Sequence, residues 1–168
     1  LTKLRREHIG FVFQFFNLLP MLNAEENILL PLTIAGVKPD RARFDELIRA
    51  VGLGDRLHHR PSELSGGQQQ RVAIARALVS EPDVVFADEP TGNLDSKTGG
   101  EILELLRHAV RDLGQTVVMV THDVDEAVLL SDKIVMMTNG PSATIGEVLS
   151  VDLPRPRNRV ELAESTQY

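Results

Sequence analysis

The sequence predicts an α/β domain built on a parallel β-sheet. Three short apolar runs, at 83–89, 116–120 and 133–138, alternate with longer stretches of helical periodicity. This alternation is typical of βαβ units, in which a helix returns the chain so that successive strands run parallel. The length of 168 residues, 42% of them hydrophobic, suits one globular domain with its own core.

Composition excludes several classes of protein. A net charge of −6 argues against a general nucleic-acid-binding protein, so no nucleic-acid partner is expected. The absence of cysteine excludes a disulfide framework and thiolate metal sites. No apolar run approaches the roughly 18 residues of a membrane span, and the basic start, 1–8, lacks the apolar core of a signal peptide.

The first elements are a strand and a helix joined by an apolar loop. Residues 8–14 are mostly β-branched or aromatic and predict a strand. Residues 15–22 form either a core-packing loop or an exposed apolar patch that receives a partner. Asn23 begins a capping-box pattern that predicts a helix over about 24–30, which Pro31 limits or kinks.

Two helices and a buried strand follow. Apolar residues at helical spacing predict helices over 40–51 and 65–78. The strand at 83–89 ends in Asp88 and Glu89, at the edge where open α/β sheets place ligands. A further helix is expected at about 97–113, with Asp95 or Ser96 as its cap and Gly114 at its end.

The last part of the chain predicts smaller elements. The strand at 116–120 leads to His122, and a short helix follows over 124–131. Asn139-Gly140 is a turn signal between the strand at 133–138 and a return strand at 144–148. From Pro154 the residues are polar and proline-rich, which favours an extended or disordered tail.

A glycine-rich turn before a helix is the first candidate binding site. Leu64-Ser65-Gly66-Gly67-Gln68 places an N-cap serine and two glycines at a helix start, where free N–H groups carry the positive end of the helix dipole. A phosphate suits such a site. The alternative is an ordinary Ser-capped helix after a Gly-rich turn.

The acidic pair suggests phosphate chemistry. Adjacent strand residues point to opposite faces, so Asp88 and Glu89 suit different roles. Asp88 can hold Mg²⁺, and Glu89 can accept a proton from an attacking water or orient it. His122 ends a neighbouring strand, where it could reach the same cavity. The alternatives are solvated acids and a structural histidine.

Taken in order, these segments resemble the nucleotide-binding domain of ATP-binding cassette (ABC) transporters. The resemblance covers the chain to about Leu153 and matches five motifs: Gln14 the Q-loop, 64–68 the signature, 84–89 the Walker B strand, Asn93-Leu94-Asp95 the D-loop and His122 the H-loop. It implies a P-loop NTPase-like parallel sheet within a partial ABC domain at 1–153. A helical signature subdomain at about 24–80 and a disordered tail at 154–168 are also expected.

The resemblance also implies roles, cofactors and partners. Two such domains, as a homodimer or pseudo-dimer, would sandwich ATP head to tail, and transmembrane permease subunits would contact 15–22. The protein would then lie peripherally at the cytoplasmic face of the inner membrane. The implied residues are Ser65, Gly66, Gly67 and Gln68 for ATP, Asp95 for coupling the two sites, Asp88 and Gln14 for Mg²⁺ and the attacking water, Glu89 as catalytic base, and His122 for the γ-phosphate.

One departure from the family pattern stands out. The phosphate loop G-x-x-x-x-G-K-[ST] does not occur, and only thirteen residues precede Gln14. We therefore expect an N-terminally truncated form of a longer protein, which alone binds ATP weakly or not at all. The alternatives are a catalytically inert module that docks on a transporter, and a soluble ABC ATPase acting on ribosomes or DNA.

The subfamily pattern divides near residue 123. Residues 2–123 resemble the lipoprotein-releasing and macrolide-export ATPases, whereas 125–161 resemble ATPases of nitrate, sulfonate or taurine importers. Both groups share the ATP-hydrolysing machinery, so the direction of transport stays open.

Overall fold

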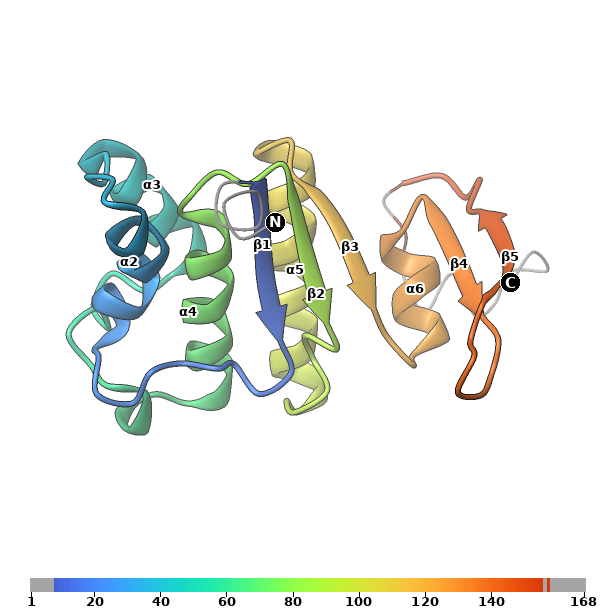
Figure 1. Cartoon of the computed structure of the whole chain (residues 1–168), viewed down its shortest axis with the longest axis horizontal. Helices are drawn as coiled ribbons and strands as arrows, with labels where there is room; N and C mark the ends of the chain where they lie inside the picture. Colours follow the sequence, from blue (N-terminus) through green and yellow to red (C-terminus); the bar gives the residue numbers. More distant parts are fainter. Residues whose placement is uncertain (1–7, 156, 158–168) are drawn as a thin grey trace. The chain divides into compact units, whose positions relative to one another are not determined.

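A computed structural model describes residues 8–155 and 157. These residues fall into two compact units, which divide between Val120 and Thr121 (Figure 1). Each unit is described by itself below.

The first unit contains a three-stranded parallel sheet. Its strands are β1 (Ile9–Phe13), β2 (Val84–Asp88) and β3 (Thr116–Val120), in the spatial order β1-β2-β3. The strands predicted at 8–14, 83–89 and 116–120 are confirmed and run parallel. The strand predicted at 133–138 is wrong as a member of this parallel sheet, because it pairs antiparallel with β5 (Ile145–Ser150) in a separate sheet. Phe13 pairs with Asp88 and Asp88 with Val120, so the three strands end at one level. The residues that follow these strands therefore emerge at the same edge of the sheet.

Four α-helices and one 3₁₀ turn accompany this sheet: α2 (Ala24–Ala35), α3 (Arg41–Val51), η1 (Pro61–Glu63), α4 (Gly66–Leu78) and α5 (Ser96–Asp112). The four predicted helices are confirmed, but an end of α2 near Leu30 is wrong. The Asn23–Glu26 capping box starts α2, and Gly36, in the left-handed region at φ 69°, ends it. Pro31 therefore lies inside α2 and does not end it.

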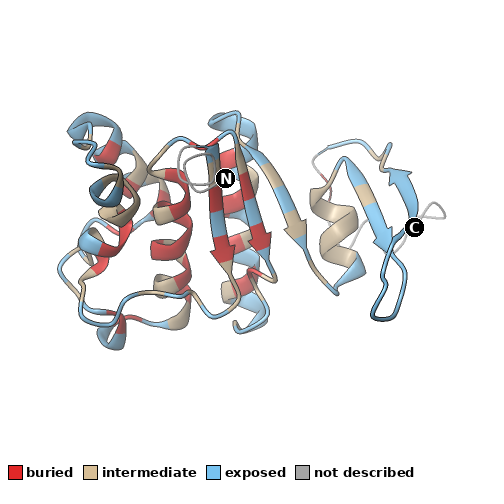
Figure 2. Ribbon diagram, viewed as in Figure 1, coloured by how far each residue is buried: buried red, intermediate tan, exposed pale blue. Residues whose placement is uncertain are grey.

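One face of the sheet is covered by helices and carries the core. Val12, Val85 and Ala87 point to this face and are buried. Gly10 lets α4 approach β1 closely, because a Cβ at this position would lie 2.6 Å from the carbonyl oxygen of Ala77. Figure 2 shows the buried residues gathered in α4 and in the strands beside it.

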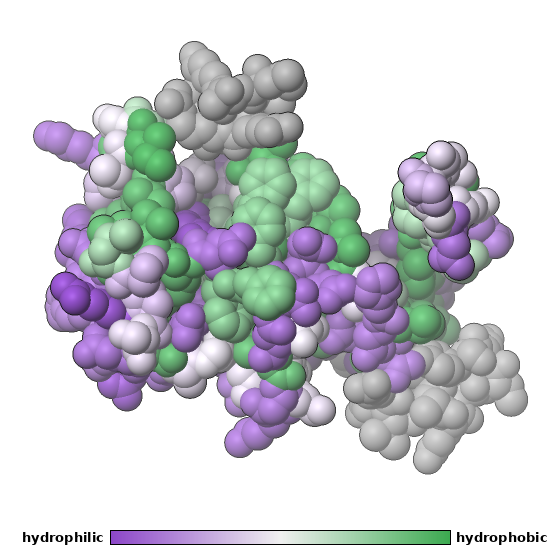
Figure 3. All heavy atoms as spheres, turned by 60° about the horizontal axis from the view of Figure 1, so that its bottom comes forward, coloured by the Kyte–Doolittle hydropathy of each residue, from purple (hydrophilic) through white to green (hydrophobic). Residues whose placement is uncertain are grey.

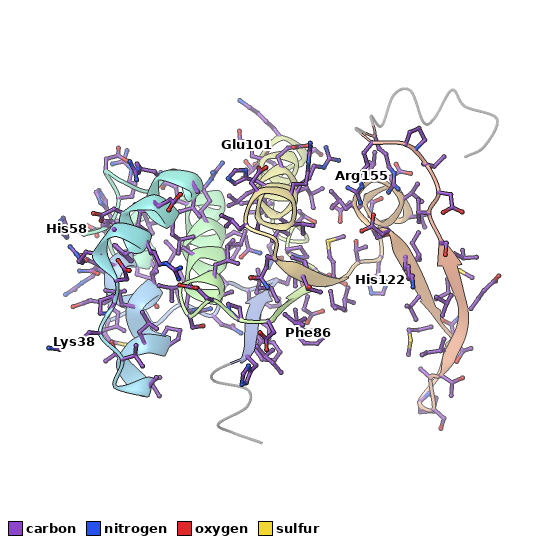
Figure 4. The ribbon with its side chains drawn as sticks, turned by 90° about the horizontal axis from the view of Figure 1, so that it is seen from above. Lys38, His58, Phe86, Glu101, His122 and Arg155 are labelled. Carbon is purple, nitrogen blue, oxygen red and sulfur yellow. The ribbon has the colours of Figure 1, made fainter. Side chains whose placement is uncertain are left out.

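The other face of the sheet is exposed among the described residues. The rings of Phe11 and Phe86 stack at a centroid distance of 5.8 Å, and both are more than a third exposed. Figure 3 shows apolar atoms across the middle of this unit, and Figure 4 shows Phe86 on the side of the sheet opposite α5. The inward and outward residues alternate along each strand as the pleat requires.

The second unit consists of α6 (Val124–Leu130) and an antiparallel hairpin of β4 (Lys133–Met137) and β5 (Ile145–Ser150). The predicted hairpin and short helix are confirmed, although β5 begins and ends later than 144–148. The guanidinium of Arg157 is buried and donates to the carbonyl oxygens of Val128 (2.9 Å) and Ser131 (2.6 Å) at the end of α6.

The region that we expected to be a disordered tail begins beside α6. Arg155 donates to the carbonyl oxygen of Leu130 at 2.8 Å, and Figure 4 shows its side chain next to α6. Pro154, Arg155 and Arg157 are therefore part of the described second unit. Residues 156 and 158–168 lie outside the described residues, so the expectation for them stays a prediction.

Candidate functional site

Gln14 and Glu89 meet at the edge where β1 and β2 end. A Cβ on Gly92 would lie 2.6 Å from Nε2 of Gln14 and 3.1 Å from Oε2 of Glu89. The amide and the carboxylate thus converge on the space above Gly92, and a side chain there would displace both. The two residues that the family resemblance assigns to the attacking water thus lie side by side at this edge.

A tight turn sets the direction of Glu89. This residue has φ 42°, in the left-handed region that non-glycine residues rarely adopt. Its N–H donates to the carbonyl oxygen of Val120 at 2.9 Å, and its own carbonyl oxygen accepts from Gly92 N–H at 3.1 Å. Strained backbone of this kind persists only where the surroundings hold it, and it concentrates at functional sites.

The backbone of Gln14 is held from the same turn. Nδ2 of Asn93 donates to the carbonyl oxygen of Gln14 at 2.9 Å. The segment after β2 therefore contacts both the backbone and the side chain of Gln14. This turn fixes the distance between the ends of the two strands.

Asp88 offers a hard oxygen ligand at the same edge. Its side chain is exposed at the last position of β2, and it has no hydrogen bond or ion pair with another described residue. Carboxylate and amide oxygens suit Mg²⁺, which keeps several waters and takes few protein ligands. The described residues contain no group of three or more His, Cys, Asp or Glu that could enclose a metal. Asp88 and Gln14 each offer an oxygen of the kind that Mg²⁺ takes from proteins.

The helix start at Ser65 has the predicted capping geometry. Ser65 Oγ accepts from Gln68 N–H at 3.3 Å, and Gln68 Oε1 accepts from Ser65 N–H at 2.9 Å. This capping box uses the Gln68 side chain, so Gln68 shapes the helix start. Ser65 is exposed and α4 has thirteen residues, which leaves a helix N-terminus open to an anion at this end.

Asp95 is linked to the glycine turn through Thr98. Asp95 caps α5, accepting from Lys97 N–H and Thr98 N–H, and its Oδ2 accepts from the Thr98 hydroxyl at 2.6 Å. The Thr98 hydroxyl is the main cause that lowers the pKa of Asp95 below its usual value, and the backbone amide of Thr98 adds to it. The methyl group of Thr98 packs directly against Gly67, which is buried.

The start of α4 also contacts the loop after Gln14. A Cβ on Gly66 would lie 3.3 Å from Cδ2 of Leu94 and 3.8 Å from Cζ of Phe16. The first unit therefore brings together the candidate residues Gln14, Asp88, Glu89, Asp95 and the glycine turn 65–67.

His122 belongs to the second unit. It is exposed between Thr121 and Asp123, where Thr121 Oγ accepts from Asp123 N–H at 3.0 Å and Asp123 caps α6. These contacts fix the backbone on both sides of His122. Its approach to the residues of the first unit stays a prediction.

Sequence reasoning missed four residues that hold this site: Gln70, Arg76, Asn93 and Thr98. Asn93 lies in a segment that we named, but its hydrogen bond to Gln14 joins residues 79 positions apart. Gln70 is fully buried although it is polar. A polar residue amid the apolar face of a predicted helix is the one signal that could have identified it.

The loop at 15–22 combines both readings of the sequence. Leu18 packs against the core, whereas Phe15 is 73% and Met21 is 65% exposed. The buried amide of Asn27 fixes this loop, accepting from Leu19 N–H at 2.8 Å and donating to Leu22 O at 3.1 Å. The loop thus presents apolar side chains on a backbone that is held in place.

Comparison with known proteins links this geometry to one family. Residues 2–92, more than half of the chain, match the family model described as "ABC transporter". No helix among the described residues has the length and apolar character needed to cross a membrane.

Several curated relatives match over most of this chain. An uncharacterized ABC transporter ATP-binding protein of Thermotoga maritima is 60% identical over 74% of this chain and 54% of its own length. The nitrate transport protein NasD of Klebsiella oxytoca is 48% identical over 94% of this chain and 62% of its own length. The bicarbonate transport ATP-binding protein CmpC of Synechocystis is 50% identical over 94% of this chain and 24% of its own length. The chain therefore spans between a quarter and two thirds of these relatives.

Solved structures agree with the fold. A dimeric bacterial ABC transporter cassette, MJ0796, superposes with a TM-score of 0.74 at 44% identity, over 89% of this chain and 66% of the cassette. A post-hydrolysis dimer of the same cassette, bound to ADP and Pi, gives the same TM-score at 43% identity.

Proposed function

Because this chain belongs to the ABC transporter family and represents its ATP-binding domain, we propose that the complete protein hydrolyses ATP to drive transport across a membrane. The observation that carries the proposal is the convergence of Gln14 and Glu89 on the space above Gly92, beside the exposed Asp88. Phosphoryl transfer requires this kind of positioning, with a group that orients water next to a metal-binding carboxylate.

Each residue has a role that its environment supports. Glu89, held by a strained turn, accepts the proton of the attacking water, and Gln14 orients that water. Asp88 and Gln14 would hold Mg²⁺, which would supply positive charge to neutralise the transferred phosphoryl group. His122 is the residue that the family resemblance assigns to the γ-phosphate.

The glycine turn at 65–67 binds the ATP that a second subunit holds. In a head-to-tail dimer, Ser65 and the N–H groups of Gly66 and Gly67 bind the γ-phosphate held by the facing subunit. The open helix N-terminus at Ser65 supports this role. Asp95 links the two sites, because Thr98 joins it to Gly67. The dimeric structure of the similar cassette MJ0796 supports the formation of a dimer.

The loop at 15–22 is the surface for a permease. Its exposed Phe15 and Met21 suit an apolar partner, and Asn27 holds the backbone that presents them. The complete protein would then lie at the cytoplasmic face of the membrane without entering it. The names of NasD and CmpC support transport of a small inorganic anion.

The main ATP-holding element of the family is not among the residues of this chain. No G-x-x-x-x-G-K-[ST] occurs in the sequence. The 168-residue polypeptide alone is therefore expected to bind ATP weakly or not at all. The upstream coding sequence should contain this loop after an apolar strand.

The test is ATP hydrolysis by the complete product of the reading frame that encodes this chain. Glu89→Gln should lower phosphate release by about 100-fold or more, while retaining ATP and trapping a nucleotide-bound dimer. A product that binds no ATP would instead favour the inert docking module. Activity without co-purification of an integral membrane protein would favour a soluble ABC ATPase.

A further inference from the structure

Helix α4 contacts the chain on both sides of Gln14 through two polar side chains. The first is Gln70, whose side chain is fully buried. Its Nε2 donates to the carbonyl oxygen of Pro90 at 2.6 Å and lies 3.4 Å from that of Phe13. Phe13 directly precedes Gln14 and Pro90 directly follows Glu89, so one amide bridges both strand ends.

The orientation of the Gln70 amide is fixed by its partners. Two carbonyl oxygens face Nε2, and an amide oxygen in that position would repel both. Oε1 of Gln70 is buried and has no hydrogen-bond partner among the described residues. A packing role alone would be served by an apolar side chain, since a buried unpaired oxygen is destabilising. The hydrogen-bond donor of the Gln70 amide is therefore what an apolar side chain at this position would lack.

The second side chain is Arg76, two turns further along α4. Its Nη2 donates to the carbonyl oxygen of Phe16 at 2.7 Å and its Nη1 to that of Asn17 at 2.6 Å. Phe16 and Asn17 are consecutive non-glycine residues in the left-handed region, at φ 60° and 49°. The guanidinium fork thus holds a strained turn that begins two residues after Gln14.

This inference rests on the function proposed above. We propose that Gln70 and Arg76 are positioning residues, through which α4, the signature helix, holds Gln14 and the turn after Glu89 in place. The same helix begins with the glycine turn at 65–67, so a displacement of that turn by a phosphate of the facing subunit moves the carbonyl partners of Gln70 and Arg76. The two side chains then transmit the occupancy of one site to the water-orienting residues of the other.

The test uses the complete protein and a double-mutant cycle. Gln70→Met keeps the length of the side chain and removes the donor together with the unpaired oxygen. It should lower kcat for ATP by about fivefold or more in the wild-type background and by less than about twofold in a Gln14→Ala background. A defect of folding or packing would lower kcat by the same factor in both backgrounds, and that result would overturn the proposal.

Gln69→Met is the matched control. The Gln69 amide donates to Leu64 O at 3.1 Å, next to the start of its own helix. Among the described residues, it has no hydrogen bond to either strand end. Its kcat should stay within about twofold of wild type in both backgrounds.

A second measurement does not depend on ATP hydrolysis. In amide hydrogen exchange of the complete protein, Gln70→Met should accelerate exchange in both 14–18 and 90–94. Arg76→Lys, which offers one nitrogen in place of two, should accelerate it in 14–18 only. Neither variant should change α3. Unchanged exchange in both segments would refute the positioning role, whereas an inactive wild type with the expected exchange pattern would refute only the proposed ATPase function.

Discussion

The contact between Gly67 and Thr98 makes Gly67→Ala a sharp test of the site's packing. A Cβ on Gly67 would lie well inside contact distance of the Thr98 methyl group, so one of the two must move. Thr98 cannot rotate freely, because its hydroxyl donates to Asp95 Oδ2 at 2.6 Å. The substitution therefore either shifts α4 relative to α5 or breaks the Thr98–Asp95 hydrogen bond.

The expected size of the effect follows from two opposing terms. Overpacking a close contact costs about 1–3 kcal/mol. Alanine recovers at most about 1 kcal/mol of helix propensity, and less in the first turn of α4. The net loss is then about 1–2 kcal/mol, which corresponds to a Tm lower by roughly 2–8 °C for a chain of this length.

Urea unfolding followed by far-UV circular dichroism measures this loss, since the chain contains no tryptophan. Thr98→Ser removes the offending methyl group and keeps the hydroxyl. The double variant Gly67→Ala/Thr98→Ser should therefore recover at least about 1 kcal/mol relative to the sum of the single variants. If the two single effects simply add, the steric explanation is wrong.

Three further predictions concern other contacts of the fold. The Thr98 hydroxyl lowers the pKa of Asp95 in the folded protein. The stabilisation from the Asp95 carboxylate is therefore complete above the unfolded pKa near 3.8, and it is lost as the pH falls through the lower folded pKa. Thr98→Val should raise the folded pKa of Asp95, which an NMR titration measures. Gly10→Ala places a Cβ 2.6 Å from the carbonyl oxygen of Ala77. It should therefore lower the free energy of unfolding, measured by urea titration, by about 1–3 kcal/mol. A free energy of unfolding within error of wild type would contradict this packing. Arg157→Ala leaves carbonyl oxygens at the end of α6 without their donor and should speed amide exchange in α6 but not in α4.

The strands and helices were predictable because they depend on local patterns. The parallel strands β2 and β3 are continuous apolar runs, and α4 and α5 begin at Ser65 and Asp95, residues that favour N-caps. The exception, α2, shows the limit of a local rule. Pro31 removes one hydrogen bond, yet α2 continues past it to Ala35.

The sequence motifs identify candidate residues, but they do not identify the residues that hold these candidates in place. Gln14, Glu89 and Asp95 belong to motifs with recognisable spacing. Gln70 and Asn93 act on backbone carbonyls far away in the sequence, at separations that no local periodicity encodes. The left-handed conformation of Phe16 was equally hidden, because nothing in the side chain of phenylalanine favours it.

The burial of α4 has a consequence for its tolerance of mutation. Val72, Ala73, Ile74 and Ala75 are all completely buried, because β1, α2, α3 and α5 contact this helix from several sides. In a saturation mutagenesis screen, positions 72–75 should all be intolerant, without the recurrence every three or four residues expected of an amphipathic helix. Helix α5, in which Ile102, Leu105, Leu106 and Ala109 are buried on one side, should show that recurrence. No residue of α4 between 66 and 78 is exposed, so this helix offers few positions at which its sequence can diversify.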